Sequence, residues 1–265
     1  LMQSGVNVHD LGICTTGTLY HATSVLEVDG GVMITASHNP PEYNGFKMCR
    51  GTAAMAGREI QDLRETFECG EFMSPDIFGE HLILEGFVDQ RLDAVISATG
   101  PITRPVNVVI DAANAVPGPF LVSVAEKLGT TGIALHCEWD NTFPHHAPDP
   151  TRPKNMIDLS DAVQTTKAEF GLGVDGDGDR IGVVDEQGRF IHPDRLLAVF
   201  AADILREIPD EASRDTRTII HDVKCSMALE HTIRENGGFP HMMRTGHSFL
   251  CLLYTSPSPR DLMRS

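Results

Sequence analysis

Short apolar segments alternate with amphipathic segments along most of this chain, and each type predicts one kind of element. Compact runs of Val, Ile, Leu and Gly predict buried strands, and longer segments with apolar residues three or four apart predict helices. Predicted strands cover residues 31–35, 106–111, 132–137, 170–174, 180–184, 218–223 and 240–244. Predicted helices cover residues 57–69, 86–97, 120–128, 155–166, 193–208 and 227–235.

This alternation predicts the fold class. Strands separated by helices are typical of parallel strands joined by crossovers, so we predict an α/β protein. We expect consecutive α/β domains with mixed or parallel sheets and helices on both faces. A Gly-Pro break near residues 97–104 and a charged linker near 208–215 divide the chain. The predicted domains are residues 1–103, residues 104–210 and the start of a third domain at residues 211–249.

Both ends of the sequence interrupt the pattern. The chain starts at Leu1 within a patterned segment rather than with Met, and its last stretch becomes rich in Ser and Pro, which cannot continue a helix. We therefore expect a fragment truncated at both ends. Residues 250–265 resemble translated sequencing-adapter sequence, and we expect this tail not to belong to the natural protein.

The amino-acid composition and net charge exclude some classes of protein and of binding partner. With 265 residues, 41% hydrophobic and 22% charged, the chain is typical of a soluble globular protein. A formal net charge of −16 argues against nucleic acid or an anionic membrane as partner, because both are negative. No apolar run is long enough for a membrane span, and no signal peptide opens the chain. The six cysteines lack any Cys-x-x-Cys spacing, which favours reduced thiols in a cytoplasmic protein over a zinc site.

An acidic segment carries the strongest chemical signal. Residues 171–180 read Gly-Leu-Gly-Val-Asp-Gly-Asp-Gly-Asp-Arg and place Asp175, Asp177 and Asp179 on alternate positions. The glycines between them allow a tight loop in which three carboxylates converge. Carboxylate oxygens suit Mg²⁺ or Ca²⁺, whereas zinc usually recruits His or Cys. The segment therefore predicts a site for a hard divalent cation.

Two alternatives to this metal site remain. With Asp175 as position 1 of an EF-hand loop, Glu186 falls at position 12, but Arg180 stands where that loop needs Gly. The flanking segments also predict strands, whereas an EF-hand needs helices. A solvated acidic turn that binds no ion is the other alternative. The pattern favours a metal-binding loop of another kind over both the EF-hand and the ion-free turn.

A second segment, residues 35–47, combines a hydroxyl with charged and rigid neighbours. Ser37 is followed by His38, a Pro-Pro turn, an Asn-Gly turn and Lys47. The segment contains no Gly-x-Ser-x-Gly, which argues against a hydrolase. Alone, it is also typical of a surface turn whose serine caps backbone amides. Beside a metal site, however, a phosphorylated Ser37 would present a dianion that the cation neutralises, so the two segments together predict phosphoryl transfer through a phosphoenzyme.

These segments resemble a known family. Thr-Ala-Ser-His-Asn-Pro at 35–40, Asn-Gly-Phe-Lys at 44–47 and Asp-Gly-Asp-Gly-Asp-Arg at 175–180 are similar to the α-D-phosphohexomutase superfamily, in its phosphomannomutase/phosphoglucomutase branch. Further matching segments are residues 111–115, 143–150, 193–197, 222–226 and 244–249. The resemblance runs from near the N-terminus to Phe249.

The resemblance implies roles for individual residues. Ser37 would be the phosphoserine, and its phosphate would hold Mg²⁺ together with the three carboxylates. The remaining implied roles are catalysis for His38 and Lys47, and substrate binding for Arg180, Lys224 and His247.

The resemblance also implies an activity. The enzyme would interconvert hexose 1-phosphate and hexose 6-phosphate, of mannose or glucose or both, through a hexose 1,6-bisphosphate intermediate. Its substrate would be a phosphosugar, and it would be a monomer or homodimer. The family closes its site with four domains, so we expect this fragment itself to be inactive. The alternative is a non-enzymatic module that binds Mg²⁺ or Ca²⁺.

Overall fold

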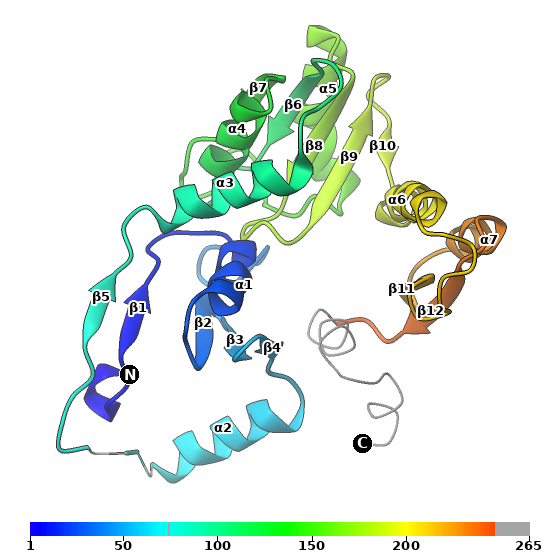
Figure 1. Ribbon diagram of the computed structural model, residues 1–265. Helices are drawn as coiled ribbons and strands as arrows, with labels where there is room; N and C mark the ends of the chain where they lie inside the picture. The colour runs from blue at the N-terminus through cyan, green and yellow to red at the C-terminus, as the bar shows by residue number, and fades with distance from the viewer. Residues whose placement is uncertain (71, 74, 247–265) are drawn as a thin grey trace.

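The computed structural model describes residues 1–70, 72–73 and 75–246, and within them the strands form four separate sheets (Figure 1). Helices connect most of these strands, so the predicted α/β class is confirmed. His247 and the predicted non-native tail lie outside the described residues. None of the helices in the part of the chain that the structure describes has the length and apolarity needed to span a membrane.

The largest sheet has five strands in the order β10-β9-β8-β6-β7. Its three parallel strands are β6 (Asn107–Asp111), β7 (Thr131–Leu135) and β8 (Phe170–Val174). Two antiparallel strands, β9 (Ile181–Asp185) and β10 (Phe190–Ile191), complete it. Val174 pairs with Ile181, so residues 175–180 form a tight connection between two strands. This sheet is therefore mixed, as predicted.

Helices cover both faces of the five-stranded sheet, because β6 is apolar on both sides. Val109 packs with Leu159 and Val163 of α5 (Ile157–Thr166), which follows a 3-10 helix at Pro153–Met156. The neighbouring Val108 and Ile110 point to the other face and pack with Ala125 of α4 (Pro117–Lys127). Helix α3 (Phe87–Thr99) lies beside α4 (Figure 1).

Helix α4 begins three residues before the predicted start at residue 120. Pro117 and Pro119 stand in its first turn, where Pro is well tolerated because its missing N–H is not needed. Gly118 is required there, since a Cβ on it would lie 2.3 Å from the carbonyl oxygen of Cys137.

The N-terminal part contains two small sheets rather than a crossover sheet. Strand β2 (Gly30–Ile34) pairs antiparallel with β3 (Phe46–Arg50), which pairs with β4 (Ala53–Ala54). Strands β1 (Val8–Asp10) and β5 (His81–Ile83) form a separate parallel pair. The remaining elements are a 3-10 helix at Met2–Ser4, α1 (Thr16–Val25) and α2 (Arg58–Cys69).

The last described elements share one small core. Helix α6 (Pro193–Glu207) packs through Ala201 and Leu205 against Leu229 and Ile233 of α7 (Met227–Glu235). Strands β11 (Thr218–Asp222) and β12 (Phe239–Met243) pair in parallel beside them (Figure 1). Helix α6 therefore packs with elements predicted for the third domain, and the domain boundaries stay predictions.

Candidate active site

Two loops that are far apart in the sequence contact each other at the candidate site. The serine loop, residues 35–45, joins β2 to β3, and the acidic loop, residues 175–180, joins β8 to β9. Ser37 Oγ donates a hydrogen bond to Asp175 Oδ2 over 2.8 Å. The backbones also approach closely, because a Cβ on Gly176 would lie 2.0 Å from the carbonyl oxygen of Ser37. Only glycine fits at this contact.

The backbone of Ser37 is strained. Its φ of 55° lies in the left-handed region, which costs a non-glycine residue on the order of 1 kcal/mol. The backbone N–H of Ser37 donates to Thr35 Oγ1 over 2.8 Å, which holds the residue in this conformation. The strain aims the hydroxyl at the acidic loop.

The acidic loop brings three carboxylates together. Oxygens of Asp175, Asp177 and Asp179 all lie within 4.8 Å of one another. Asp175 is fully buried, Asp177 is 3% exposed and the side chain of Asp179 is 15% exposed. Asp175 Oδ1 accepts hydrogen bonds from the backbone N–H groups of Asp179 and Arg180, each over 2.9 Å. The loop therefore folds around its own first carboxylate.

Lys47 places a positive charge against the other two carboxylates. Its Nζ lies 2.5 Å from Asp177 Oδ2 and 2.6 Å from Asp179 Oδ2. Thr16, at the start of α1, donates its hydroxyl to Asp177 Oδ2 over 2.8 Å, and its backbone N–H donates to the carbonyl oxygen of Asp177. Sequence reasoning did not find Thr16.

Burial and neighbouring charges shift the pKa values of Asp175 and Asp177 in opposite directions. Burial, together with the neighbouring charges of Asp179 and Asp177, raises the pKa of Asp175 to about 6. Burial also acts to raise the pKa of Asp177, but hydrogen bonds from Lys47 and Thr16 outweigh it and lower that pKa. Burial acts to lower the pKa of Lys47, yet its two carboxylate partners raise it overall. Lys47 is therefore an ammonium cation beside an ionised Asp177.

The donor set fits a hard cation. Asp177 Oδ1 is buried and has no hydrogen-bond partner among the residues that the structure describes. An unpaired buried carboxylate oxygen is costly unless a cation or a donor reaches it. All the converging atoms are oxygens, as Mg²⁺ prefers. The flanking elements β8 and β9 are strands, which removes the EF-hand alternative.

His38 and Arg180 also contact this cluster. Nδ1 of His38 is 3.2 Å from Ser37 Oγ, and Nε2 is 3.4 Å from a terminal nitrogen of Arg180. A guanidinium only donates hydrogen bonds, so we assign the ring proton of His38 to Nδ1, where it faces Ser37 Oγ. The Ser37 hydroxyl then donates to Asp175, which makes that carboxylate the nearest acceptor for its proton.

Two other predicted site residues are not brought to this cluster. Lys224, just after β11, is exposed, and its side chain forms no hydrogen bond or ion pair within the described part of the chain. His247 lies outside the described residues. The structure therefore unites Ser37, His38, Lys47, Arg180 and the three aspartates, and it adds Thr16 to them.

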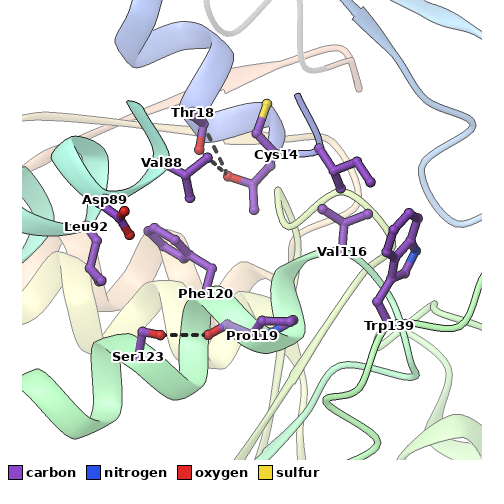
Figure 2. A pocket seen from close by; sticks show the side chains of 12 residues that line it. Cys14, Thr18, Val88, Asp89, Leu92, Val116, Pro119, Phe120, Ser123 and Trp139 are labelled. Atoms are coloured by element: carbon purple, nitrogen blue, oxygen red, sulfur yellow. Dashed lines mark hydrogen bonds between the residues drawn. The ribbon is translucent and has the colours of Figure 1, made fainter. Parts of the chain in front are cut away.

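Two hollows adjoin α1. A groove of about 960 Å³ follows β1, α1 and β2 and ends at Gly176 and Asp177. A smaller cavity of about 270 Å³ lies between α1, α3 and α4. Figure 2 shows that Val88, Leu92 and Phe120 line one side of it and that Trp139 lies at the other. Gly176 and Asp177 line the larger groove and not this cavity, so the larger groove is the one that leads to the charged cluster.

Comparisons with known proteins agree along the chain. Three family models match in succession, described as phosphoglucomutase/phosphomannomutase alpha/beta/alpha domain I at residues 1–73, domain II at 85–188 and domain III at 192–254. A phosphomannomutase/phosphoglucomutase of Pseudomonas aeruginosa is 42% identical over 251 residues, which are 94% of this chain and 52% of that protein. A phosphoglucomutase of Neisseria gonorrhoeae is also 42% identical, over 94% of this chain and 53% of that protein.

A solved structure shows the same similarity. The phosphoglucomutase/phosphomannomutase family protein of Burkholderia thailandensis is 38% identical to this chain, with a TM-score of 0.88. The match covers 98% of this chain and 56% of that one. The chain thus spans about half the length of the relatives it matches.

Proposed function

This chain belongs to the phosphoglucomutase/phosphomannomutase family, and from that membership we propose that the protein is a phosphohexomutase. It would interconvert hexose 1-phosphate and hexose 6-phosphate through a hexose 1,6-bisphosphate. The names of its relatives favour mannose or glucose, or both, as the sugar. The observation that carries the proposal is the 2.8 Å hydrogen bond between Ser37 Oγ and Asp175 Oδ2, which joins the serine loop to the acidic loop.

Ser37 would carry the phosphoryl group. In the forward transfer, the bond between phosphorus and Ser37 Oγ breaks, and Oγ keeps the electron pair. A new bond joins phosphorus to a sugar hydroxyl oxygen, whose proton passes to a base. His38 is the candidate for this base, because its Nε2 is unprotonated in the assigned tautomer. In the return transfer Ser37 Oγ forms a bond to a phosphorus of the bisphosphate, while the bond between that phosphorus and the sugar oxygen breaks. The sugar oxygen keeps the electron pair and takes a proton from an acid, and Asp175 Oδ2 is placed to accept the proton of the Ser37 hydroxyl.

Asp175, Asp177, Asp179 and a phosphate oxygen on Ser37 would hold Mg²⁺. When bound, the ion would neutralise charge on the phosphoryl oxygens during transfer. The partnerless Asp177 Oδ1 supports this ligand set. Lys47 adds a fixed ammonium beside the same carboxylates, where it would attract the phosphate and act as an acid.

Arg180, with its side chain 42% exposed beside His38, would contact the phosphate of the substrate. We extend the proposal to Lys224 and His247 as substrate contacts from the third domain. A cytoplasmic location, a monomer or homodimer, and the absence of nucleic-acid and membrane partners complete it. Cys14, Cys69 and Cys137 are free thiols, which is compatible with a reducing compartment.

The half-reaction on Ser37 tests the proposal directly. The assay uses a form of the protein that spans the full length of its relatives, because the 265-residue fragment itself is expected to be inactive. This protein is purified and incubated with glucose 1,6-bisphosphate and Mg²⁺, and its intact mass is measured. We expect the mass of one added phosphoryl group on Ser37, none in Ser37→Ala, and strong reduction in Asp177→Asn. Ser24, whose hydroxyl bonds the carbonyl oxygen of His21, provides the matched control Ser24→Ala, which should be phosphorylated normally.

The alternative of a non-enzymatic cation-binding module gives the opposite results. It predicts Mg²⁺ or Ca²⁺ binding that Ser37→Ala leaves unchanged, together with no phosphoryl uptake by the unmodified protein. Absence of phosphate on Ser37 after incubation with bisphosphate and Mg²⁺ would therefore refute the mutase proposal.

A further inference from the structure

A second cluster of potential ligands lies outside the candidate active site. Asp111 ends β6, His136 follows β7, and His146 lies in the loop that leads toward α5. One ligand atom from each side chain lies within 4.8 Å of the others. Asp111 is 2% exposed, and the side chains of His136 and His146 are 13% and 16% exposed. The topology therefore places two half-buried imidazoles and a buried carboxylate at one end of the sheet.

The hydrogen bonds of His146 leave its Nε2 directed at a carboxylate. Nδ1 lies 3.0 Å from the carbonyl oxygen of Ala147, so Nδ1 carries a proton and donates. Nε2 lies 3.0 Å from Asp111 Oδ2, and two lone-pair atoms at that distance need a proton or a metal ion between them. Asp111 Oδ1 is already engaged, since it accepts from the backbone N–H of Ala113 over 2.9 Å.

This arrangement matches the surroundings of metal ligands in proteins. A metal-binding histidine usually donates its second N–H to a backbone carbonyl or a carboxylate, and a metal-binding carboxylate usually accepts a further hydrogen bond. His146 and Asp111 meet both conditions. Both side chains are therefore oriented by outer partners toward one point.

His136 is fixed in place from two directions. Its Nε2 lies 3.4 Å from Asp158 Oδ2, and its ring stacks on His145 with centroids 3.7 Å apart. Its φ of 49° is uncommon for a residue other than glycine. Such strained positions concentrate at functional sites. Asp158 therefore orients this imidazole from outside the cluster.

We propose that Asp111, His136 and His146 form a second metal site, which selects a divalent transition metal such as Zn²⁺ over Mg²⁺. Two imidazole nitrogens and one carboxylate oxygen are a common zinc ligand set, whereas Mg²⁺ favours oxygen ligands alone. The neighbouring Cys137 is not a ligand, because its thiol donates to the carbonyl oxygens of Ile110 and Leu135.

The ion would brace a wall of the candidate active site. It would tie the ends of β6 and β7 to the loop that carries His146. Two residues further along that loop, Pro148 is buried beside the acidic loop, and a Cβ on Gly176 would lie 3.6 Å from Pro148 Cγ. The proposed site is therefore structural, and its occupancy does not depend on the mutase proposal.

Cobalt absorption tests the site in the full chain. The protein is stripped with a chelator, saturated with Mg²⁺ to occupy the acidic loop, and titrated with Co²⁺ while the visible spectrum is recorded. The experiment uses a Cys69→Ser background, because Cys69 is exposed and its thiol binds cobalt readily. We expect one equivalent of Co²⁺ with visible absorption bands, displaced by one equivalent of Zn²⁺.

Matched variants assign the absorption to these ligands. His146→Gln and His136→Gln should each lose the cobalt bands. His145→Gln should keep them, because His145 Nδ1 bonds Asn114 instead and the residue lies outside the ligand set. Equal cobalt binding in His146→Gln and in the unchanged protein would overturn the proposal, as would no cobalt binding at all.

Nuclear magnetic resonance keeps the proposal testable if a variant fails to fold. In the unchanged protein, Zn²⁺ added in the presence of Mg²⁺ should shift the ring signals of His136 and His146. The exposed His231, whose side chain is 73% accessible, should keep its signals. Shifts at His231 without shifts at His136 and His146 would show only surface binding and would refute the site.

Discussion

Substitution of Gly176 by Ala tests whether the contact between the two loops is required for chemistry. The added Cβ would lie 2.0 Å from the carbonyl oxygen of Ser37, whereas real Cβ contacts stay above 3.0 Å. The backbone at Gly176 has no positive φ, so alanine can adopt its conformation. The steric contact alone must therefore push the serine loop away from the acidic loop.

The size of the effect follows from that displacement. The loops must separate by roughly 1 Å, and a misplacement of this size costs on the order of a hundredfold in rate, about 2.7 kcal/mol. We expect phosphoryl transfer from glucose 1,6-bisphosphate to Ser37 to slow by that factor in Gly176→Ala. The assay follows the intact mass of the protein with time at saturating Mg²⁺.

A matched alanine substitution separates this effect from loss of fold. Gly17 lies in α1, where an added Cβ meets only Thr15 Oγ1 at 3.8 Å. Gly17→Ala should keep the rate and stabilise the helix by about 1 kcal/mol. Circular dichroism should show the same helix content in both variants. A rate for Gly176→Ala within about threefold of the unchanged protein would refute the reasoning, because a hundredfold loss is expected.

Three further predictions concern stability. Lys47→Met leaves buried carboxylates without their cation, so the free energy of unfolding in urea without Mg²⁺ should fall by about 2 kcal/mol. Added Mg²⁺ should restore part of this loss. An unchanged urea midpoint would contradict the ion pairs of Lys47. Burial acts to raise the pKa of Asp149, but hydrogen bonds from Thr151 and Arg152 lower that pKa overall. The ionised Asp149 therefore stabilises the fold at pH values above the usual pKa of 3.8, and this stabilisation is lost as the pH falls through the lower pKa of the folded state. Asp149→Asn should therefore lower the midpoint of thermal unfolding at pH 7, and the difference from the unchanged protein should shrink below pH 3.8; a constant difference would contradict this assignment. Leu159→Ala removes a fully buried side chain that packs on β6 and should cost about 3 kcal/mol in urea unfolding, whereas a loss below about 1 kcal/mol would contradict the packing.

Sequence reasoning located the acidic loop and its flanking strands, because both signals are local. Glycine and aspartate alternate within six residues, and β8 and β9 are short apolar runs. The antiparallel pairing of β2 with β3 was less clear, since alternating strands and helices favoured parallel crossovers. The Asn-Gly turn before Lys47 was the local sign of that hairpin.

Helix α1 escaped sequence reasoning for a different reason. Its sequence Thr-Gly-Thr-Leu-Tyr-His-Ala-Thr-Ser-Val contains few strong helix formers, and three of its threonines are buried. Thr16 is buried because it bonds to Asp177, which lies 161 residues later. Such a contact depends on the tertiary structure, and no periodic pattern in the sequence predicts it. The pairing of His146 with Asp111 likewise depends on how the loop after β7 folds back.

The hydrogen bond between Ser37 and Asp175 joins residues 138 positions apart. Neither loop contains a complete site, so the site exists only after two separately built sheets have docked. Closing such a long loop in the chain is slow, and long-range contacts form late in folding. We therefore expect a folding intermediate with normal helix content that cannot accept a phosphoryl group. Recovery of phosphoryl uptake after refolding should lag behind recovery of the circular dichroism signal.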